Sequence, residues 1–306
     1  MPATLPPPSR QRAPIGRWSK HLAREWALAR RRPILPAAAR PQPARWKASD
    51  LSAAWLGHST VLINFCGIQI ITDPVLFPRC GIRLPGMTIG PKRLTAPALT
   101  AKELPPIDLV LLSHAHFDHF DLRTLHHLPH TADVVTAART SDLLRWTRFR
   151  SKTDLRWGQT IELRRASGAL EVRAFQVRHW GARLQHDDYR GYNGYVLERE
   201  GRRIIFGGDT AMSGTFAELR GRQRYDLALM AIGAYDPWIR SHATPEEAIA
   251  MADAAGAEYI MPLHHQTFRL SAEPFFEPIE RFEAALQGDP HRVALRAIGE
   301  TFTLTP

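Results

Sequence analysis

Four side chains of types that bind metal ions occur within six residues, and this cluster limits the fold more than any other feature. Residues 108–112 are apolar after the first and predict a buried strand, and His114, His116, Asp118 and His119 follow it. Alternate residues of an extended segment point the same way, so His114 and His116 can hold one ion together. Asp118 and His119 lie where a loop becomes a helix and can face a second ion. Imidazole and carboxylate are ligands that suit zinc.

One segment cannot complete two coordination spheres, so further ligands must come from elsewhere in the chain. His179, Asp209 and His264 each follow an apolar run that predicts a strand. Taken singly, such residues are more often ordinary polar groups at strand ends. Because they accompany the cluster, we expect all three to reach it.

The composition is that of an ordinary globular protein. The 306 residues are 44% hydrophobic and 23% charged, and no apolar run approaches the ~20 residues that a membrane span needs. The two cysteines, Cys66 and Cys80, make neither a disulfide framework nor a cysteine zinc cluster. With no apolar secretory signal at the N-terminus, we expect a cytoplasmic protein.

Residues 1–48 form a basic, proline-rich N-terminal extension. Through Asp50 the chain has nine arginines and two lysines against two acidic residues, which gives +9 of the total charge of +10. Trp18, Leu22 and Trp26 recur at helical spacing. We therefore expect a short interfacial helix that makes peripheral contact with an anionic membrane, on its inner face. A solvated tail, or tryptophans packed on the following domain, are the alternatives.

Residues 49–306 alternate strand and helix patterns, which predicts one α/β domain with two sheets flanked by helices. The expected helices lie near 119–127, 211–220, 244–256 and 274–287. The third is the best defined, because Thr244 is a favoured N-cap residue and Pro245 a favoured first residue. The expected strands are 53–56, 60–65, 68–72, 109–112, 134–135, 172–177, 195–197, 203–206, 227–232 and 259–263.

The motif His-x-His-x-Asp-His at 114–119, the isolated His179, the sequence Gly208-Asp209-Thr210 and His264 together resemble the metallo-β-lactamase superfamily. The resemblance implies a four-layer αββα sandwich. Further motifs resemble the branch that contains N-acylphosphatidylethanolamine-hydrolysing phospholipase D and ascorbate-6-phosphate lactonase. They are Trp55-Leu56-Gly57-His58-Ser59-Thr60, Thr72-Asp73-Pro74, Ile232-Gly233-Ala234-Tyr235, His242-Ala243-Thr244-Pro245 and His264-His265-Gln266-Thr267-Phe268.

The resemblance also implies a ligand set for two zinc ions per chain, with manganese(II) or iron(II) as alternatives. A carboxylate between the ions is expected because two cations close together repel. The first ion would take His114, His116 and His179, the second Asp118, His119 and His264, and Asp209 would bridge them.

The expected activity is hydrolysis, with a metal-bound hydroxide as the nucleophile. A phospholipase D-like phosphodiesterase is favoured over a lactonase of the ascorbate-6-phosphate type. We expect Asp118, His58 and His242 to take part in catalysis, and Asp73 to orient a ligand through hydrogen bonds. The partner would be a small-molecule or lipid-like ester, and we expect no nucleic-acid partner.

Aromatic residues near the expected strand ends favour a substrate with an apolar portion. They are Trp180, Tyr192, Tyr195, Tyr235, Trp238 and Phe268, with Arg183 or Arg240 as auxiliary contacts. His265 and Gln266 stand where the phospholipase has Trp and Gly, so the lipid substrate does not simply carry over.

Three other functions agree less well with the sequence. A flavo-diiron oxygen reductase would need a flavin domain and Glu in place of His116. A nuclease of this fold would need an inserted clamp domain, and only 54 residues separate Asp209 from His264. A non-enzymatic binding module would not need a complete ligand set.

Overall fold

The computed structural model describes residues 32–184 and 186–305. The expected helix with Trp18, Leu22 and Trp26 therefore lies outside the described residues. In the part of the chain that is described, no helix has the length and hydropathy to cross a membrane.

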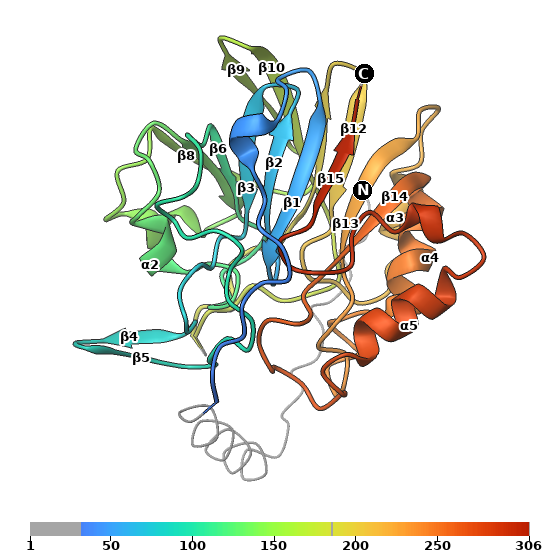
Figure 1. Cartoon of the computed structure of the whole chain (residues 1–306). Helices are drawn as coiled ribbons and strands as arrows, with labels where there is room; N and C mark the ends of the chain where they lie inside the picture. Colours follow the sequence, from blue (N-terminus) through green and yellow to red (C-terminus); the bar gives the residue numbers. More distant parts are fainter. Residues whose placement is uncertain (1–31, 185, 306) are drawn as a thin grey trace.

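Two large sheets face each other and form the centre of the molecule (Figure 1). The first has the order β15-β1-β2-β3-β6-β7-β8 and the second the order β14-β13-β12-β11-β10-β9. The first sheet contains β1 (Leu51–Gly57), β2 (Thr60–Phe65), β3 (Ile68–Thr72), β6 (Leu109–Leu111), β7 (Asp133–Ala137), β8 (Ser151–Leu155) and β15 (Thr301–Leu304). The second contains β9 (Thr160–Arg165), β10 (Gly168–Phe175), β11 (Gly194–Arg199), β12 (Arg202–Phe206), β13 (Tyr225–Ala231) and β14 (Ala257–Leu263).

Helices cover the outer faces of the two sheets, which completes the four-layer αββα sandwich and confirms the expected fold class. On the second sheet lie α3 (Thr215–Glu218), α4 (Pro245–Ala255) and α5 (Glu277–Ala285); α2 (Leu122–Leu125) lies on the side of the first sheet (Figure 1). The short 3₁₀ helices are η1 (Pro43–Arg45), η2 (Ser141–Leu144) and η3 (Pro290–Arg292). The helices expected at 119–127 and 211–220 are only the single turns α2 and α3.

Helix α4 begins as the sequence predicts. The Thr244 side chain accepts a hydrogen bond from the backbone N–H of Glu247, and the Glu247 side chain accepts one from Thr244. This reciprocal capping satisfies two N–H groups that have no partner within the helix. The helix ends at Gly256, whose φ of 82° is in the left-handed region.

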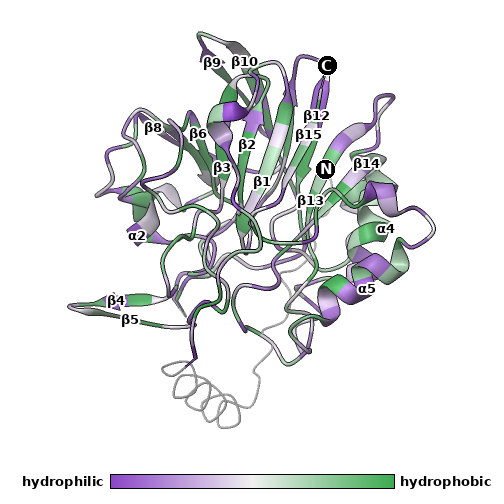
Figure 2. Ribbon diagram, viewed as in Figure 1, coloured by the Kyte–Doolittle hydropathy of each residue, from purple (hydrophilic) through white to green (hydrophobic). Residues whose placement is uncertain are grey.

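Two apolar layers hold the sandwich together. Side chains from the inner faces of both sheets, such as Leu62, Leu111 and Leu197, form the larger cluster. A second cluster joins the outer face of the second sheet to α4 and α5, through residues such as Met251 and Phe282. Figure 2 shows that most strands carry hydrophobic residues along the centre of the molecule. Strands β1, β2 and β7 are buried along their whole length, as expected of central strands covered on both faces, whereas β8, β9 and β15 keep exposed positions.

Residues 32–48, which we assigned to the extension, lie against the domain where they are described. The Leu35 N–H donates to the carbonyl of Leu94, and the Ala39 N–H donates to the carbonyl of Ile298. Trp46 packs on the larger core cluster. The boundary at residue 48 stays a prediction.

The sequence did not predict a small hairpin made of β4 (Ile82–Leu84) and β5 (Met87–Ile89), nor strands β8, β9 and β15. The hairpin projects from the body of the protein (Figure 1). A tight turn joins β2 and β3, with positive φ angles of 48° at Cys66 and 88° at Gly67.

Candidate metal centre

The segment after β6 brings its histidines to the edge of the first sheet, where they meet residues from the second. The first group of potential ligands is His114, His116 and His179, whose ligand atoms lie within 4.8 Å of one another. Nε2 of His114 is 2.8 Å and Nε2 of His179 is 3.3 Å from Nδ1 of His116. Three imidazole nitrogens therefore face one point.

The second group forms beside the first. It contains Asp118, His119 and His264, together with His58. Oδ2 of Asp118 is 3.5 Å from Nε2 of both His119 and His264. Asp118 and His119, the two residues of the initial cluster that we assigned to a second ion, thus gather with His264 and His58.

Asp209 lies between the two groups. Its Oδ2 is 3.1 Å from Nε2 of His119 and of His264, on one side. On the other side it is 4.0 Å from Nε2 of His114 and 3.8 Å from Nε2 of His179. The structure therefore brings all seven predicted ligands together, with Asp209 in the position of a bridge. Their roles as ligands stay predictions.

Several polar atoms in this cluster are buried and have no hydrogen-bond partner among the described residues. They include Nε2 of His116, His119 and His264, and Oδ1 of Asp209. An unpartnered buried polar atom is costly, whereas coordination of a cation would use these lone pairs. The donor set, of imidazoles and carboxylates, therefore fits the metal ions that the sequence predicts.

The electrostatics of the cluster agree with this fit. Burial lowers the pKa of His116 to about 3 and that of His179 to about 4, so both rings are neutral at pH 7, the form that binds metal. Burial also acts on His264, but Asp209 and Asp118 outweigh it and raise its pKa to about 9. Against burial, the same carboxylates raise the pKa of His119, so without a cation they favour the positively charged form of both rings.

Asp73 holds one of the predicted ligands, His119, through a hydrogen bond, as the sequence predicts. Its carboxylate accepts hydrogen bonds from Nδ1 of His119 (2.7 Å), from the Ser113 hydroxyl (2.5 Å) and from the Ser113 N–H (2.7 Å). With Nδ1 engaged, the Nε2 atom of His119 faces Asp118 and Asp209. Ser113, to which sequence reasoning gave no role, also contacts Nδ1 of His114 (2.9 Å).

The backbone around the site adopts a conformation that residues other than glycine rarely take. His58, Asp73 and His264 have φ angles of 55°, 31° and 64°. Such residues persist only where their surroundings hold them, and they gather at functional sites. At Gly233 a Cβ atom would lie 2.3 Å from the His264 carbonyl, so only glycine permits the approach of this loop.

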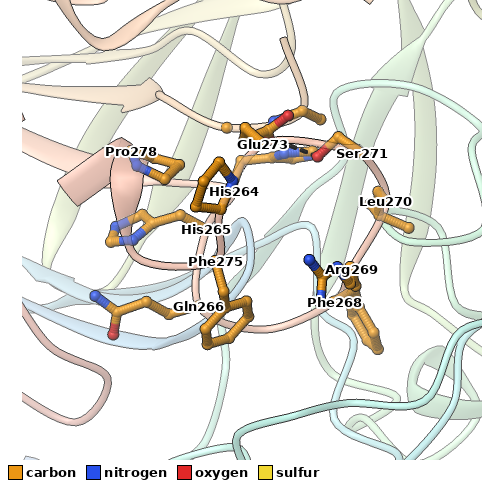
Figure 3. A pocket seen from close by; sticks show the side chains of 13 residues that line it. His264, His265, Gln266, Phe268, Arg269, Leu270, Ser271, Glu273, Phe275 and Pro278 are labelled. Atoms are coloured by element: carbon orange, nitrogen blue, oxygen red, sulfur yellow. Dashed lines mark hydrogen bonds between the residues drawn. The ribbon is translucent and has the colours of Figure 1, made fainter. Parts of the chain in front are cut away.

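A small pocket lies beside His264 and shows how its loop is held (Figure 3). The Glu273 carboxylate accepts hydrogen bonds from the Ala234 N–H and from the Ser271 hydroxyl. His265 lines this pocket, and its ring lies 4.5 Å from that of Trp55. The residues after His264 thus support the ligand loop, and Glu273 is a supporting residue that sequence reasoning missed.

The two histidines expected in catalysis occupy different positions. Nε2 of His58 is 2.9 Å from Oδ2 of Asp118, and burial lowers its pKa to about 3. His242 lies on the other side, with Nδ1 3.8 Å from Oδ2 of Asp209. His179, Asp209 and His242 form a further group of closely spaced ligand atoms.

Of the aromatic residues expected near the substrate, one lies exposed at the site and others are engaged within the fold. Trp180 lies at the site, 37% exposed, with its ring 4.5 Å from His116 and 4.4 Å from His179. The expectation for Tyr195 was wrong: it is fully buried within β11, and its hydroxyl donates to the carbonyl of Leu112. The Tyr235 hydroxyl likewise donates to Glu277.

Arg183 supports the ligand segment. Its guanidinium donates to the carbonyls of Ala115 (2.9 Å) and Phe120 (2.7 Å) and lies over the ring of Phe117. The guanidinium that we expected to contact substrate is therefore already hydrogen-bonded within the protein. Its two bonds link both ends of the His-rich turn.

Comparison with known proteins identifies the family. Residues 69–265 match the model of the β-lactamase superfamily domain, a span that includes all seven predicted ligands. The chain belongs to the metallo-β-lactamase superfamily. Solved structures with a similar fold include an isothiocyanate hydrolase from Delia radicum gut bacteria (TM-score 0.65, 18% identity, 83% of this chain and 99% of that chain). A metallo hydrolase from the archaeon Ignicoccus hospitalis has a TM-score of 0.62 at 18% identity, over 84% of this chain and 99% of that one.

Among curated relatives, this metallo-β-lactamase superfamily member is 32% identical to an uncharacterised protein of Mycobacterium tuberculosis, over 90% of this chain and 76% of the relative. It is 28% identical to N-acyl-phosphatidylethanolamine-hydrolyzing phospholipase D 1 of Caenorhabditis elegans, over 77% of this chain and 69% of that protein. The expected branch of the superfamily is thereby confirmed.

Proposed function

We propose that the protein is a dinuclear, zinc-dependent phosphodiesterase whose substrates carry an apolar portion. The position of Asp209 supports the dinuclear centre. One of its carboxylate oxygens, Oδ2, lies within 4.0 Å of imidazole nitrogens from both ligand groups. Bound at these residues, two zinc ions would activate water and offset the negative charge of a phosphodiester.

The ligand set alone does not select the bond that is cleaved. The phosphodiester assignment is supported by the similarity to phospholipases D of N-acyl-phosphatidylethanolamine in Caenorhabditis elegans and yeast. Trp180 adds a local argument. Its exposed ring beside His116 and His179 offers an apolar surface where a substrate would enter.

The two further histidines have separate roles in this proposal. His58 is neutral and hydrogen-bonded to Asp118, so it acts as a positioning residue for that carboxylate. His242 has no hydrogen-bond partner at Nδ1 among the described residues. Its place beside Asp209 suits contact with a substrate oxygen, and its neutral ring can donate a single hydrogen bond there.

The experiment compares chelator-treated and zinc-loaded protein on two phosphodiesters that differ only in a long or short acyl chain. We expect activity only after reloading, and a kcat/KM at least tenfold higher for the long chain. Trp180→Ala should reduce this preference, while Trp146→Ala, at an exposed position elsewhere on the surface, should leave it unchanged. Equal kcat/KM values for the two phosphodiesters would contradict the proposal that substrates carry an apolar portion. Full activity without metal would contradict the zinc-dependent centre.

A further inference from the structure

The β4–β5 hairpin has one apolar face that nothing in the described structure covers. Its register pairs Ile82 with Ile89 and Leu84 with Met87, while Arg83 pairs with Thr88. Because alternate residues of a strand share a face, the four apolar side chains lie together and the polar pair lies opposite. Each of the four is 43 to 50% exposed.

The two strands of the hairpin are held close together where it leaves the body of the protein. A Cβ atom at Gly81 would lie 2.1 Å from the Ile89 carbonyl oxygen, and one at Gly90 would lie 2.0 Å from that of Cys80. The two strands therefore approach so closely at the neck that a side chain at either Gly81 or Gly90 would collide with the backbone of the other strand. Cys80 is buried and packs with Val75 and Phe268, which anchors the hairpin on the body.

This anchor lies next to the metal centre. The ring of Phe268 is 5.2 Å from the ring of His58, and Phe268 follows the ligand His264 closely in the chain. The hairpin projects from the end of the molecule where the loop after β14 lies (Figure 1). Trp180 and Met212 follow the predicted ligands His179 and Asp209 in the chain, and their exposed apolar side chains add to the apolar character of the site's surroundings.

The chain segment that carries the hairpin is basic. Between Asp73 and Glu103 the sequence has no acidic residue, but it has Arg79, Arg83, Lys92, Arg93 and Lys102. Of these, Arg93 is buried in the structure. Apolar side chains beside basic ones match a bilayer with anionic headgroups, which offers both an apolar interior and negative charge.

A second protein molecule fits this face less well. Four half-exposed aliphatic side chains provide roughly a few hundred Å², below the ~800 Å² per partner of a specific protein interface. A lipid surface needs no such complementary shape. The open backbone edges of a two-stranded ribbon limit its depth, because unpaired N–H and C=O groups are costly in the hydrocarbon region.

We propose that the β4–β5 hairpin inserts its apolar face into the surface of an anionic bilayer and so places the metal centre at the lipid interface. Arg83 and Thr88 then face the headgroups. The proposal is independent of which bond the enzyme cleaves, since membrane binding is measured without turnover.

The test uses the full-length, zinc-loaded protein and vesicles of phosphatidylcholine with or without one quarter phosphatidylglycerol. Leu84→Ser/Met87→Ser should lower the partition coefficient on anionic vesicles at least tenfold. Trp146→Ser, which removes an exposed aromatic ring elsewhere, is the matched control and should bind normally. The hydrolysis of a short soluble phosphodiester should be the same in all three proteins. Unchanged vesicle binding of the double variant would overturn the proposal.

A second measurement distinguishes the two faces of the hairpin. An environment-sensitive fluorophore is attached to Met87→Cys or to Thr88→Cys, in a chain whose own cysteines, Cys66 and Cys80, are buried. On adding anionic vesicles, emission should shift to the blue at position 87 and much less at position 88. Equal shifts would contradict insertion by one face. A label at position 87 that is shielded before vesicles are added would show that the chain itself, or a second copy, covers this face, and would also overturn the proposal.

Discussion

Nδ1 of His119 lies 2.7 Å from Oδ2 of Asp73, and both side chains are fully buried. This pairing leaves only Nε2 of His119 free to face Asp118 and Asp209. A carboxylate behind a ligating imidazole fixes the ring orientation and increases the basicity of the ligand. The relationship also links β3, whose end leads to Asp73, to the His-rich turn after β6.

We predict that Asp73→Asn lowers the affinity for zinc about 10 to 100-fold, because an amide is a weaker acceptor for Nδ1 of His119. Ser113→Ala is the comparison, since it removes one donor to Asp73 and the contact with Nδ1 of His114 but keeps the pair of Asp73 and His119. We expect a smaller loss of affinity in that variant. Titration against a competing chelator measures both, and an Asp73→Asn protein with wild-type affinity would refute the supporting role.

Asp209→Asn should lower kcat/KM by about 100-fold or more and reduce the zinc content below two ions per chain. The change replaces one oxygen of a group that faces both ligand sets, while the apolar core stays intact. Metal analysis, circular dichroism and steady-state kinetics are the measurements. Asp226→Asn, which alters a carboxylate paired with Arg202, should leave all three unchanged. Near-normal turnover with two bound ions in Asp209→Asn would exclude the bridge.

Zinc binding to the metal-free protein should release protons. Burial lowers the pKa values of His119 and His264, but the nearby carboxylates outweigh it and raise that of His264 to about 9 and that of His119 well above its usual value. Both rings are protonated at pH 7.5 and must lose the proton to bind metal. About two protons should therefore be released per chain, and affinity should rise with pH up to about 9 by as much as ~100-fold per pH unit.

Calorimetry in buffers of different ionisation enthalpy measures this release. His116 and His179 contribute no protons in this range, because burial lowers their pKa values to about 3 and about 4. Zinc binding with no proton release at pH 7.5, or an affinity that is constant between pH 6 and 8, would show that His119 and His264 are already neutral.

The gathering of the predicted ligands could be inferred from the sequence more readily than the elements around them. The His-rich turn follows a buried strand within one segment, so local pattern reveals it. The hairpin β4–β5 has strands of only three residues, too short for a periodic pattern. Strand β15 pairs with β1 from the far end of the chain, a contact that local pattern cannot detect. Tyr195 was misplaced because β11 is buried on both faces, so an aromatic residue within it belongs to the core.

The basic extension remains a predicted membrane contact. Because Leu35 and Ala39 are hydrogen-bonded to the domain, the suitable truncation removes residues 1–31 and keeps residues 32–306. We expect this truncation to weaken co-sedimentation with anionic vesicles, and the difference to shrink as salt is added. Identical, salt-insensitive binding of the two proteins would remove the extension from this role.

The central claim is phosphodiester hydrolysis at a two-metal centre, and one comparison tests it most directly. kcat/KM is measured for a phosphodiester and for a lactone of similar size, on the same zinc-loaded preparation. We predict that the phosphodiester has the higher value, and that Asp209→Asn lowers both activities by about 100-fold or more because they need the same centre. A lactone preferred by more than about tenfold, equivalent to ~1.4 kcal/mol of transition-state stabilisation, would contradict the proposed reaction.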